Sequence, residues 1–267
     1  MKTSQWIGVL PAALILLATA SGNVSAKETE TSKDVYETGA HPRLSLRNIN
    51  GSLTIQGWNK KEFEVTAVKT VGREEYLDDV EIRRNFDDDH LRIDVKYDDF
   101  DDDDENRWHN GSIVSVDFTI RVPYGTEIDA VELVNGDIEI KNVEGDVEVS
   151  SVNGEVSGEK LGGHVELATV NGEVSLRADG GVKSIRMHSV NGGVTLVLPK
   201  KFDARINAGT VHGSIRAIDG LDVDATKFTG SSMQGTIGKG GLNVDLNTVN
   251  GSIEIRHEGE GGSRDKE

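Results

Sequence analysis

Apolar residues recur along the central part of the chain in a fixed pattern with steps of 4, 2 and 3 residues, and the residues between them are polar or glycine. The first two repeats of the pattern are Val134, Ile138, Ile140, Val143, Val147, Val149 and Val152. β-Branched residues two positions apart predict short, half-buried strands, because alternate side chains of a strand point to the same face. The repeating steps therefore predict units of about nine residues, each contributing one strand.

The tripeptide Val-Asn-Gly marks every second unit. It begins at Val134, Val152, Val170 and Val190, at spacings of 18, 18 and 20 residues, and returns at Val249. Self-similarity at a fixed period indicates a repeat architecture, here with about 18 residues per coil. Stacked coils would place the asparagines one above another, about 4.8 Å apart, where their amides can form a hydrogen-bonded ladder. The predicted ladder consists of Asn135, Asn153, Asn171, Asn191 and Asn250.

Two architectures fit this pattern. Asn-Gly between apolar runs is the strongest short-range signal for a β-hairpin, which would give an antiparallel sandwich or barrel. However, a hairpin relates its strands by approximate mirror symmetry, whereas the apolar positions here repeat by translation. The sequence therefore favours an all-β fold, a single-stranded parallel β-solenoid (β-helix) with right-handed winding and an irregular β-rich N-terminal part. Its coils would enclose a core of Val, Ile and Leu, and the glycine after each asparagine would allow a positive φ at the corner.

The remaining segments are expected to have different roles. Residues 1–26 have the features of a secretory signal peptide, namely Lys2, an apolar run from Trp6 to Ala20 and small residues at Val24-Ser25-Ala26; an uncleaved anchor is the alternative. The other expected segments are a flexible lead-in (27–34), an irregular β-strand region capping the solenoid (35–128) with an acidic loop (98–105), the repeat solenoid (129–256) and a disordered tail (257–267).

Charge narrows the choice of partners. The chain has 29 basic and 46 acidic residues, a formal net charge of −17, and it has no cysteine. Recognition of phosphate needs a basic surface, so the charge argues against a nucleic-acid partner and against an anionic lipid surface. The mature chain is not expected to span a membrane, because no second apolar run follows the signal segment. Cations, cationic peptides and neutral glycans remain possible ligands.

Several motifs together resemble one family. They are the signal segment, an Asn50-Gly51 strand that ends in Gly57-Trp58, the pair Val122-Pro123, and the following ladder of Val-Asn-Gly repeats. The chain resembles the bacterial domain-of-unknown-function 4097 family over residues 35–255. The resemblance implies a β-helical exported domain, usually labelled a "putative adhesin", and supplies no catalytic motif; relatives in some bacteria are tied to envelope-stress systems.

Candidate catalytic groups are few. Glycoside hydrolysis needs two carboxylates in one cleft. Asp137, Glu155 and Glu173 share one repeat position and are expected to point outward as a column, and Glu148 and Glu166 form a second pair. Repeated surface carboxylates are more often a solvated face than a site, so no catalytic residue and no cofactor are predicted.

The sequence offers two weak metal-site candidates. His188 and His212 follow successive predicted corners and could approach one another. Asp101, Asp102, Asp103 and Asp104 could bind Ca²⁺ weakly, although the run lacks the spaced ligands and turn glycine of a calcium loop. No metal site is assigned.

These observations predict an exported, non-enzymatic, adhesin-like interaction module of the bacterial cell envelope, located in the periplasm or at the cell surface. Its partner would be an envelope protein or a glycan. The alternatives are a β-helical carbohydrate-active enzyme and an envelope-stress protein that binds cationic peptides.

Overall fold

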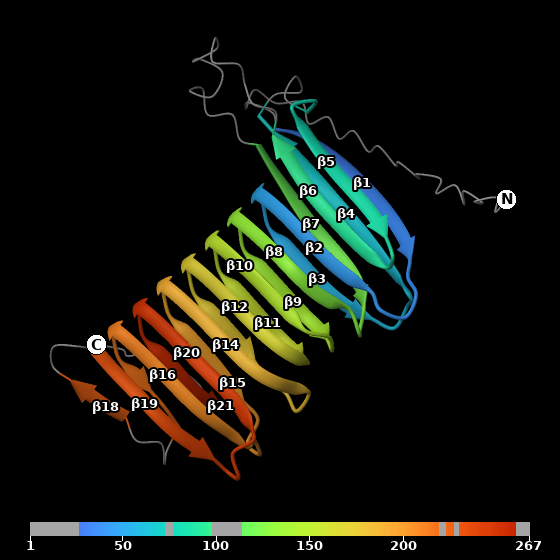
Figure 1. Ribbon diagram of the computed structural model, residues 1–267. Helices are drawn as coiled ribbons and strands as arrows, with labels where there is room; N and C mark the ends of the chain where they lie inside the picture. The colour runs from blue at the N-terminus through green and yellow to red at the C-terminus, as the bar shows by residue number, and fades with distance from the viewer. Residues whose placement is uncertain (1–26, 73–76, 98–113, 219–222, 227–229, 260–267) are drawn as a thin grey trace.

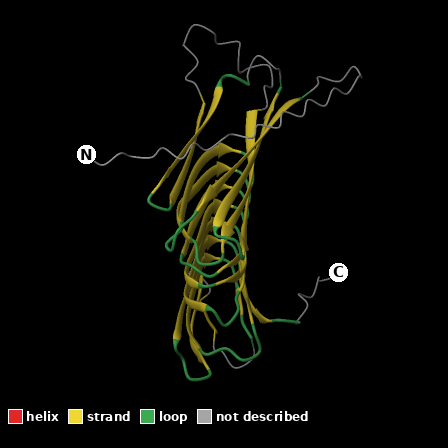
Figure 2. Cartoon of the chain, turned by 90° about the vertical axis from the view of Figure 1, so that its right-hand side faces the viewer, coloured by secondary structure: helices red, strands yellow, loops and turns green. Residues whose placement is uncertain are grey.

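The computed structural model describes residues 27–72, 77–97, 114–218, 223–226 and 230–259, and within these residues the chain is all-β without a helix. The strands lie side by side along the length of the molecule and form two facing sheets (Figures 1 and 2). Among the described residues there is no helix with the length and apolarity needed to cross a membrane.

Sheet A and sheet B take strands from the chain alternately over most of its length. In spatial order, sheet A consists of β1 (Glu28–Glu37), β4 (Glu62–Val71), β7 (Val114–Pro123), β3 (Leu53–Trp58), β9 (Ile138–Val143), β11 (Val156–Leu161), β13 (Val174–Arg177), β15 (Val194–Leu198), β21 (Ile253–His257) and β17 (Ile215–Arg216). Sheet B consists of β18 (Val223–Thr226), β19 (Gly230–Ile237), β16 (Ala204–His212), β20 (Leu242–Asn250), β14 (Val182–Asn191), β12 (Gly163–Asn171), β10 (Val147–Asn153), β8 (Glu127–Asn135), β2 (Arg43–Asn50), β6 (His90–Tyr97) and β5 (Val80–Asp87).

In the central repeats, each coil contributes one strand to sheet B and the next strand to sheet A. Equivalent strands of successive coils pair in parallel and in register, so that Glu148 lies opposite Glu166 and Asn153 opposite Asn171. The same holds for β9, β11, β13 and β15 in sheet A. The Asn-Gly motifs had made an antiparallel sandwich or barrel the alternative architecture, and this alternative is wrong for these repeats.

The coils at both ends are stacked out of chain order. The coil formed by β20 and β21 lies between the β14–β15 coil and the β16–β17 coil, as Figure 1 shows for β20. At the other end, the coil formed by β2 and β3 lies between β6–β7 and β8–β9. Antiparallel strands then complete the ends, with β1, β4 and β5 at one end and β18 and β19 at the other.

The segment boundaries differ from those expected. Residues 27–34 were expected to be a flexible lead-in, but β1 covers most of them, because its backbone pairs with β4 and ion pairs such as Lys33–Glu64 (3.0 Å) hold it there. Position 129 is no structural boundary, since β2 and β3 already form a regular coil before it. The expected tail begins inside β21, and the nitrogen of Glu258 donates to the Leu198 oxygen at 2.9 Å. The acidic loop (98–105) and residues 260–267 lie outside the described residues.

The core lies between the two sheets and is built from Val, Ile and Leu. Ile138, Ile140, Val147 and Val149 are each at most 2% exposed. In contrast, the valine that precedes each ladder asparagine faces solvent, and Val152 is 40% exposed. These valines belong to the apolar repeat but lie outside the core, because strand side chains alternate between faces. The inward position before them is taken by Ser or Thr in most coils, and by Leu133 before Val134.

Glycine at each corner is needed for close packing between coils. A Cβ on Gly154 would lie 2.0 Å from the carbonyl oxygen of Gly136, and the same clash recurs from coil to coil. Within this row of glycines only Gly51 and Gly172 have a positive φ. A positive φ therefore explains the glycine at only these two corners. At the other corners, the glycine is explained by the close approach of the neighbouring coil's backbone.

Candidate functional site

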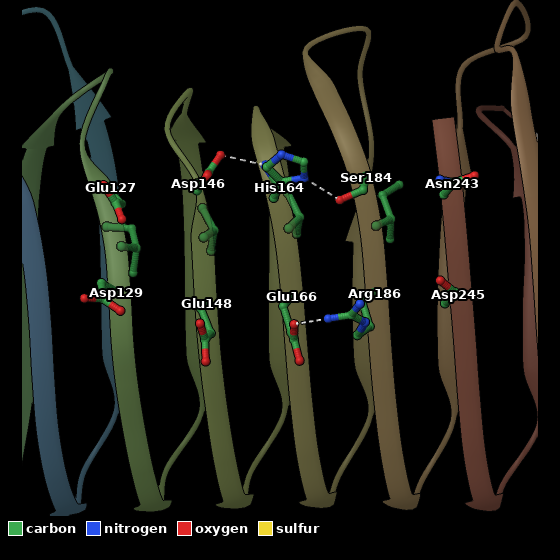
Figure 3. Close-up of a pocket in the computed structure, with 14 residues that line it drawn as sticks. Glu127, Asp129, Asp146, Glu148, His164, Glu166, Ser184, Arg186, Asn243 and Asp245 are labelled. Atoms are coloured by element: carbon green, nitrogen blue, oxygen red, sulfur yellow. Dashed lines mark hydrogen bonds and ion pairs between the residues drawn. The ribbon is translucent and has the colours of Figure 1, made fainter. Parts of the chain in front are cut away.

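The outer face of sheet B carries the most regular arrangement of chemical groups on the chain. Alternate residues of β10, β12, β14 and β20 point outward, and the parallel register places equivalent positions beside one another. Two rows of polar side chains result (Figure 3). The first is Asp146, His164, Ser184 and Asn243; the second, which we call the acidic row, is Glu148, Glu166, Arg186 and Asp245. Together with Glu127 and Asp129 of β8, these residues line a shallow groove of about 520 Å³.

The groove is negatively charged. Among the described residues, Arg186 is the one arginine or lysine that lines it, and it is paired with Glu166 at 2.7 Å. His164 Nδ1 lies 2.7 Å from Ser184 Oγ, and the His164 backbone nitrogen donates to Asp146 Oδ1 at 2.9 Å. The remaining carboxylates are acceptors without a paired arginine, so the surface suits ligands that present positive charge or N–H and O–H donors.

Asp137, Glu155 and Glu173 form a second column at the corner where the chain enters sheet A. The backbone nitrogen of Glu155 donates to Asp137 Oδ1 at 2.8 Å, and Thr195 donates to Glu173 Oε1 at 2.8 Å. Partial burial raises the pKa of Glu155, and the nearby charges of Glu173 and Asp137 raise it further. This column lies apart from the groove on sheet B, whereas Glu148 and Glu166, the second candidate pair, lie side by side in that groove.

The five asparagines of the predicted ladder are brought together. Each side-chain nitrogen donates to the side-chain oxygen of the preceding rung at 2.8–2.9 Å, and all the bonds run in the same direction. The ladder also includes Asn50, which accepts from Asn135 at 2.9 Å, and His212 occupies the equivalent position beyond Asn250. Sequence reasoning did not include Asn50 in the ladder, although the Ile49-Asn50-Gly51 motif differs from the repeat by one residue.

A buried row of hydroxyl groups was also missed. At five corners, the Ser or Thr two places before the ladder position donates to the corner carbonyl of the neighbouring coil. The signal was visible as Ser/Thr-Val-Asn-Gly, which is absent at Asn50 and Asn135, where Asn48 and Leu133 take this place. The donor–acceptor pairs are Ser151–Gly136, Thr169–Gly154, Ser189–Gly172, Thr248–Gly192 and Thr210–Gly251, at 2.8–3.0 Å.

The histidine pair does not form. Strand β20 lies between β14 and β16, and His188 is in register with Asn247, whereas His212 is in register with Asn250. No group of three or more His, Cys, Asp or Glu side chains that could hold a metal occurs among the described residues. Asp101, Asp102, Asp103 and Asp104 lie outside them.

The solvent-facing valines form a continuous apolar row beside the Asn ladder. We call this row the apolar ridge; its members, 39–49% exposed, are Ile49, Val134, Val152, Val170, Val190, Val249 and Val211. Grooves of about 650 and 690 Å³ follow it along the outer face of sheet B. An exposed apolar row of this length on a strongly charged protein indicates an interaction surface.

The family model described as Toastrack DUF4097 matches residues 12–256. The chain belongs to this family. Among solved structures, this Toastrack chain is similar to a "putative cell adhesion protein" from Clostridium sporogenes, with 16% identity, a TM-score of 0.48 and coverage of 86% of this chain and 100% of that one. It is also similar to a "putative adhesin" from Bacteroides fragilis, with 11% identity, a TM-score of 0.37 and coverage of 85% and 97%. No similar protein was found among those with curated functions.

Proposed function

We propose that this Toastrack chain is an exported, non-enzymatic, adhesin-like interaction module of the bacterial cell envelope that binds its partner through the outer face of sheet B. The observation that carries the proposal is the continuity of that face, where the acidic row and the apolar ridge cross neighbouring strands in register. Residues 1–26 direct the chain to the periplasm or cell surface, and the mature chain winds as a right-handed β-solenoid.

Rigidity supports this role. Every coil in the centre is tied to its neighbours by backbone bonds, by the Asn ladder and by the buried hydroxyl row. Side chains on such a face are ordered before the partner arrives, which lowers the entropy lost on binding. Glu148 and Glu166 share the groove on sheet B, but Glu166 is bonded to Arg186 at 2.7 Å, which favours binding over glycoside hydrolysis by a pair of free carboxylates.

A charge-reversal experiment tests the proposed surface. The variant Glu148→Lys with Glu166→Lys reverses two charges on sheet B, and Glu139→Lys with Glu159→Lys makes the same change on sheet A. We expect the sheet B variant to lose at least about 10-fold in binding to envelope material from the producing bacterium, and the sheet A variant to bind like the wild type. Equal losses in both variants, or no loss in either, would contradict the proposal.

Two further measurements test its other parts. N-terminal sequencing of the protein recovered from cell fractions is expected to start at Lys27 in an exported fraction. The second measurement is glycan hydrolysis. If the wild type hydrolyses a glycan and Glu148→Gln or Glu166→Gln abolishes this activity, the carbohydrate-active alternative is supported instead.

A further inference from the structure

The outer face of sheet B contains a channel that runs across the strands. One wall is the apolar ridge, and the opposite wall is the acidic row. The floor is the row between them, two residues from each wall, and it consists of Ser150, Ala168, His188, Asn247 and Gly209. At one end the floor is closed by the Arg47–Glu132 ion pair (3.1 Å). His188 lines both grooves that follow the apolar ridge, of about 650 and 690 Å³, and lies where they meet.

The dimensions of the channel match an α-helix. Residues two apart on a strand are separated by about 6.6–6.8 Å, so the two walls stand about 13 Å apart. A helix with its side chains is about 10–12 Å across. The open part of the channel, from Val152 to Val211, spans four intervals of about 4.8 Å, or about 19 Å, which is the length of a helix of about 13 residues.

The chemistry of the walls defines the helix. Aliphatic side chains on one side of the helix would bury the apolar ridge, where Val152, Val170 and Val190 are each about 40% exposed. Basic side chains on the adjacent side would meet Glu148 and Asp245 and would compete with Arg186 for Glu166, to which it is bonded at 2.7 Å. A second copy of this chain is a poor occupant, because it also carries a net charge of −17 and would bring further carboxylates to the surface. An extended strand could not pair here, because backbone groups are exposed at the edges of a sheet and not on its face.

We infer that the channel binds a basic amphipathic helix, of about 13 residues, supplied by a partner polypeptide. This inference rests on the proposed function and specifies the partner of the same surface. The helix lies along the stack, perpendicular to the strands, with its apolar stripe on the ridge and its lysines or arginines over the acidic row. Helix-in-groove recognition of this kind uses apolar anchors at i, i+3, i+4 and i+7.

A pair of peptides tests the shape requirement. The first is an 18-residue peptide of leucine and lysine with the leucines on one helical face, and the second has the same composition in an order that destroys the apolar stripe. Titrated into the mature chain at moderate salt, the amphipathic peptide is expected to bind at least about 10-fold more tightly. Equal affinity for the two peptides would overturn the inference, because it would mean that charge alone drives binding.

Variants of the floor test the location. Ala168→Trp fills the middle of the channel, and Ser175→Trp is the matched change on the outer face of sheet A. The first is expected to weaken binding of the amphipathic peptide at least about 10-fold and the second to leave it unchanged. Val170→Asp, at an exposed position, provides a second channel variant should Ala168→Trp impair folding. Unchanged binding in a folded channel variant would overturn the inference.

The two proposals can fail separately. Should the peptide bind no better than its scrambled form while the Glu148→Lys, Glu166→Lys variant still loses envelope binding, the helix is the wrong partner and the proposed surface stands. Should that variant keep its envelope binding, the proposed function itself is wrong.

Discussion

The hydroxyl group of Thr169 donates to the backbone carbonyl oxygen of Gly154, 2.9 Å away in the neighbouring coil. Thr169 is 4% exposed, so this bond satisfies a carbonyl in a region that water barely reaches. The same bond recurs in most coils, so the corner of each coil is fixed by a side chain of the next.

Removing this hydroxyl tests its contribution to stability. Thr169→Val keeps the shape of the side chain but leaves the Gly154 carbonyl without its donor, so we expect a loss of about 1–2 kcal/mol in the free energy of unfolding. Thr169→Ser keeps the donor and is expected to lose less. Urea denaturation measures both, and equal stability of Thr169→Val and the wild type would contradict the prediction.

The close approach of corner glycines predicts a large effect of a single methyl group. In Gly154→Ala the new Cβ would lie 2.0 Å from the Gly136 oxygen, so backbone must move, and we expect a loss of about 3 kcal/mol or more. The control is Gly180→Ala, where no atom lies within 4 Å of the added Cβ. That control is expected to stay within about 0.5 kcal/mol of the wild type. Similar melting temperatures for the two variants would count against the clash.

The Asn ladder is expected to act as a coupled unit. Asn153 donates to Asn135 and accepts from Asn171, so alanine at 153 or 171 breaks bonds that the other residue shares. A double-mutant cycle on Asn153 and Asn171 is expected to show a coupling of about 0.5–1 kcal/mol. The corresponding cycle on Asn153 and Glu159 should show none. Full additivity for the asparagine pair would mean that these exposed amides contribute independently.

The column of carboxylates predicts a pH-dependent effect. Burial, Glu173 and Asp137 raise the pKa of Glu155, so its charged form is disfavoured in the folded chain. A carboxyl with a raised folded-state pKa stabilises the fold below its unfolded pKa, and this contribution is lost as the pH rises through the folded value. Glu155→Gln is therefore expected to raise stability at pH 7 by about 0.5 kcal/mol, the scale of cross-strand charge pairs. The gain should shrink as the pH falls through the raised folded value and be absent below the unfolded value of about 4.5. A gain independent of pH would point to packing instead. Thermal melts from pH 4 to 7 measure this, with Glu127→Gln as the control.

The local features of the repeat were predictable from the sequence, whereas the order of the coils was not. Translational spacing around Asn153 and Asn171 is enough to predict parallel stacking and the ladder, because both depend on neighbours one period apart. The position of β20 depends on long-range pairing across the β16–β19 segment, which leaves no periodic trace in the sequence. His212 in place of asparagine further concealed that Thr210-Val211-His212-Gly213 is another corner.

The direction of the ridge side chains was missed for a different reason. Val152 belongs to the same apolar repeat as Val147 and Val149, and the repeat alone does not distinguish it from these core residues. The deciding residue is Ser151, whose hydroxyl is needed inside by the Gly136 carbonyl. A polar group thus takes the inward place, and its apolar neighbour turns to solvent, where it contributes to the candidate surface.

The placement of β20 and β21 also constrains how the polypeptide can be shortened. In an ordinary solenoid, deleting the final repeat removes one terminal layer and leaves the others in contact. Here β20 and β21 lie between β14–β15 and β16–β17, so their deletion would open a gap inside the structure. Strands β20 and β21 are synthesised after the coils on both sides of them, and the stack cannot close until they are present. A product truncated before β20 would therefore show protease-sensitive strands on both sides of the gap.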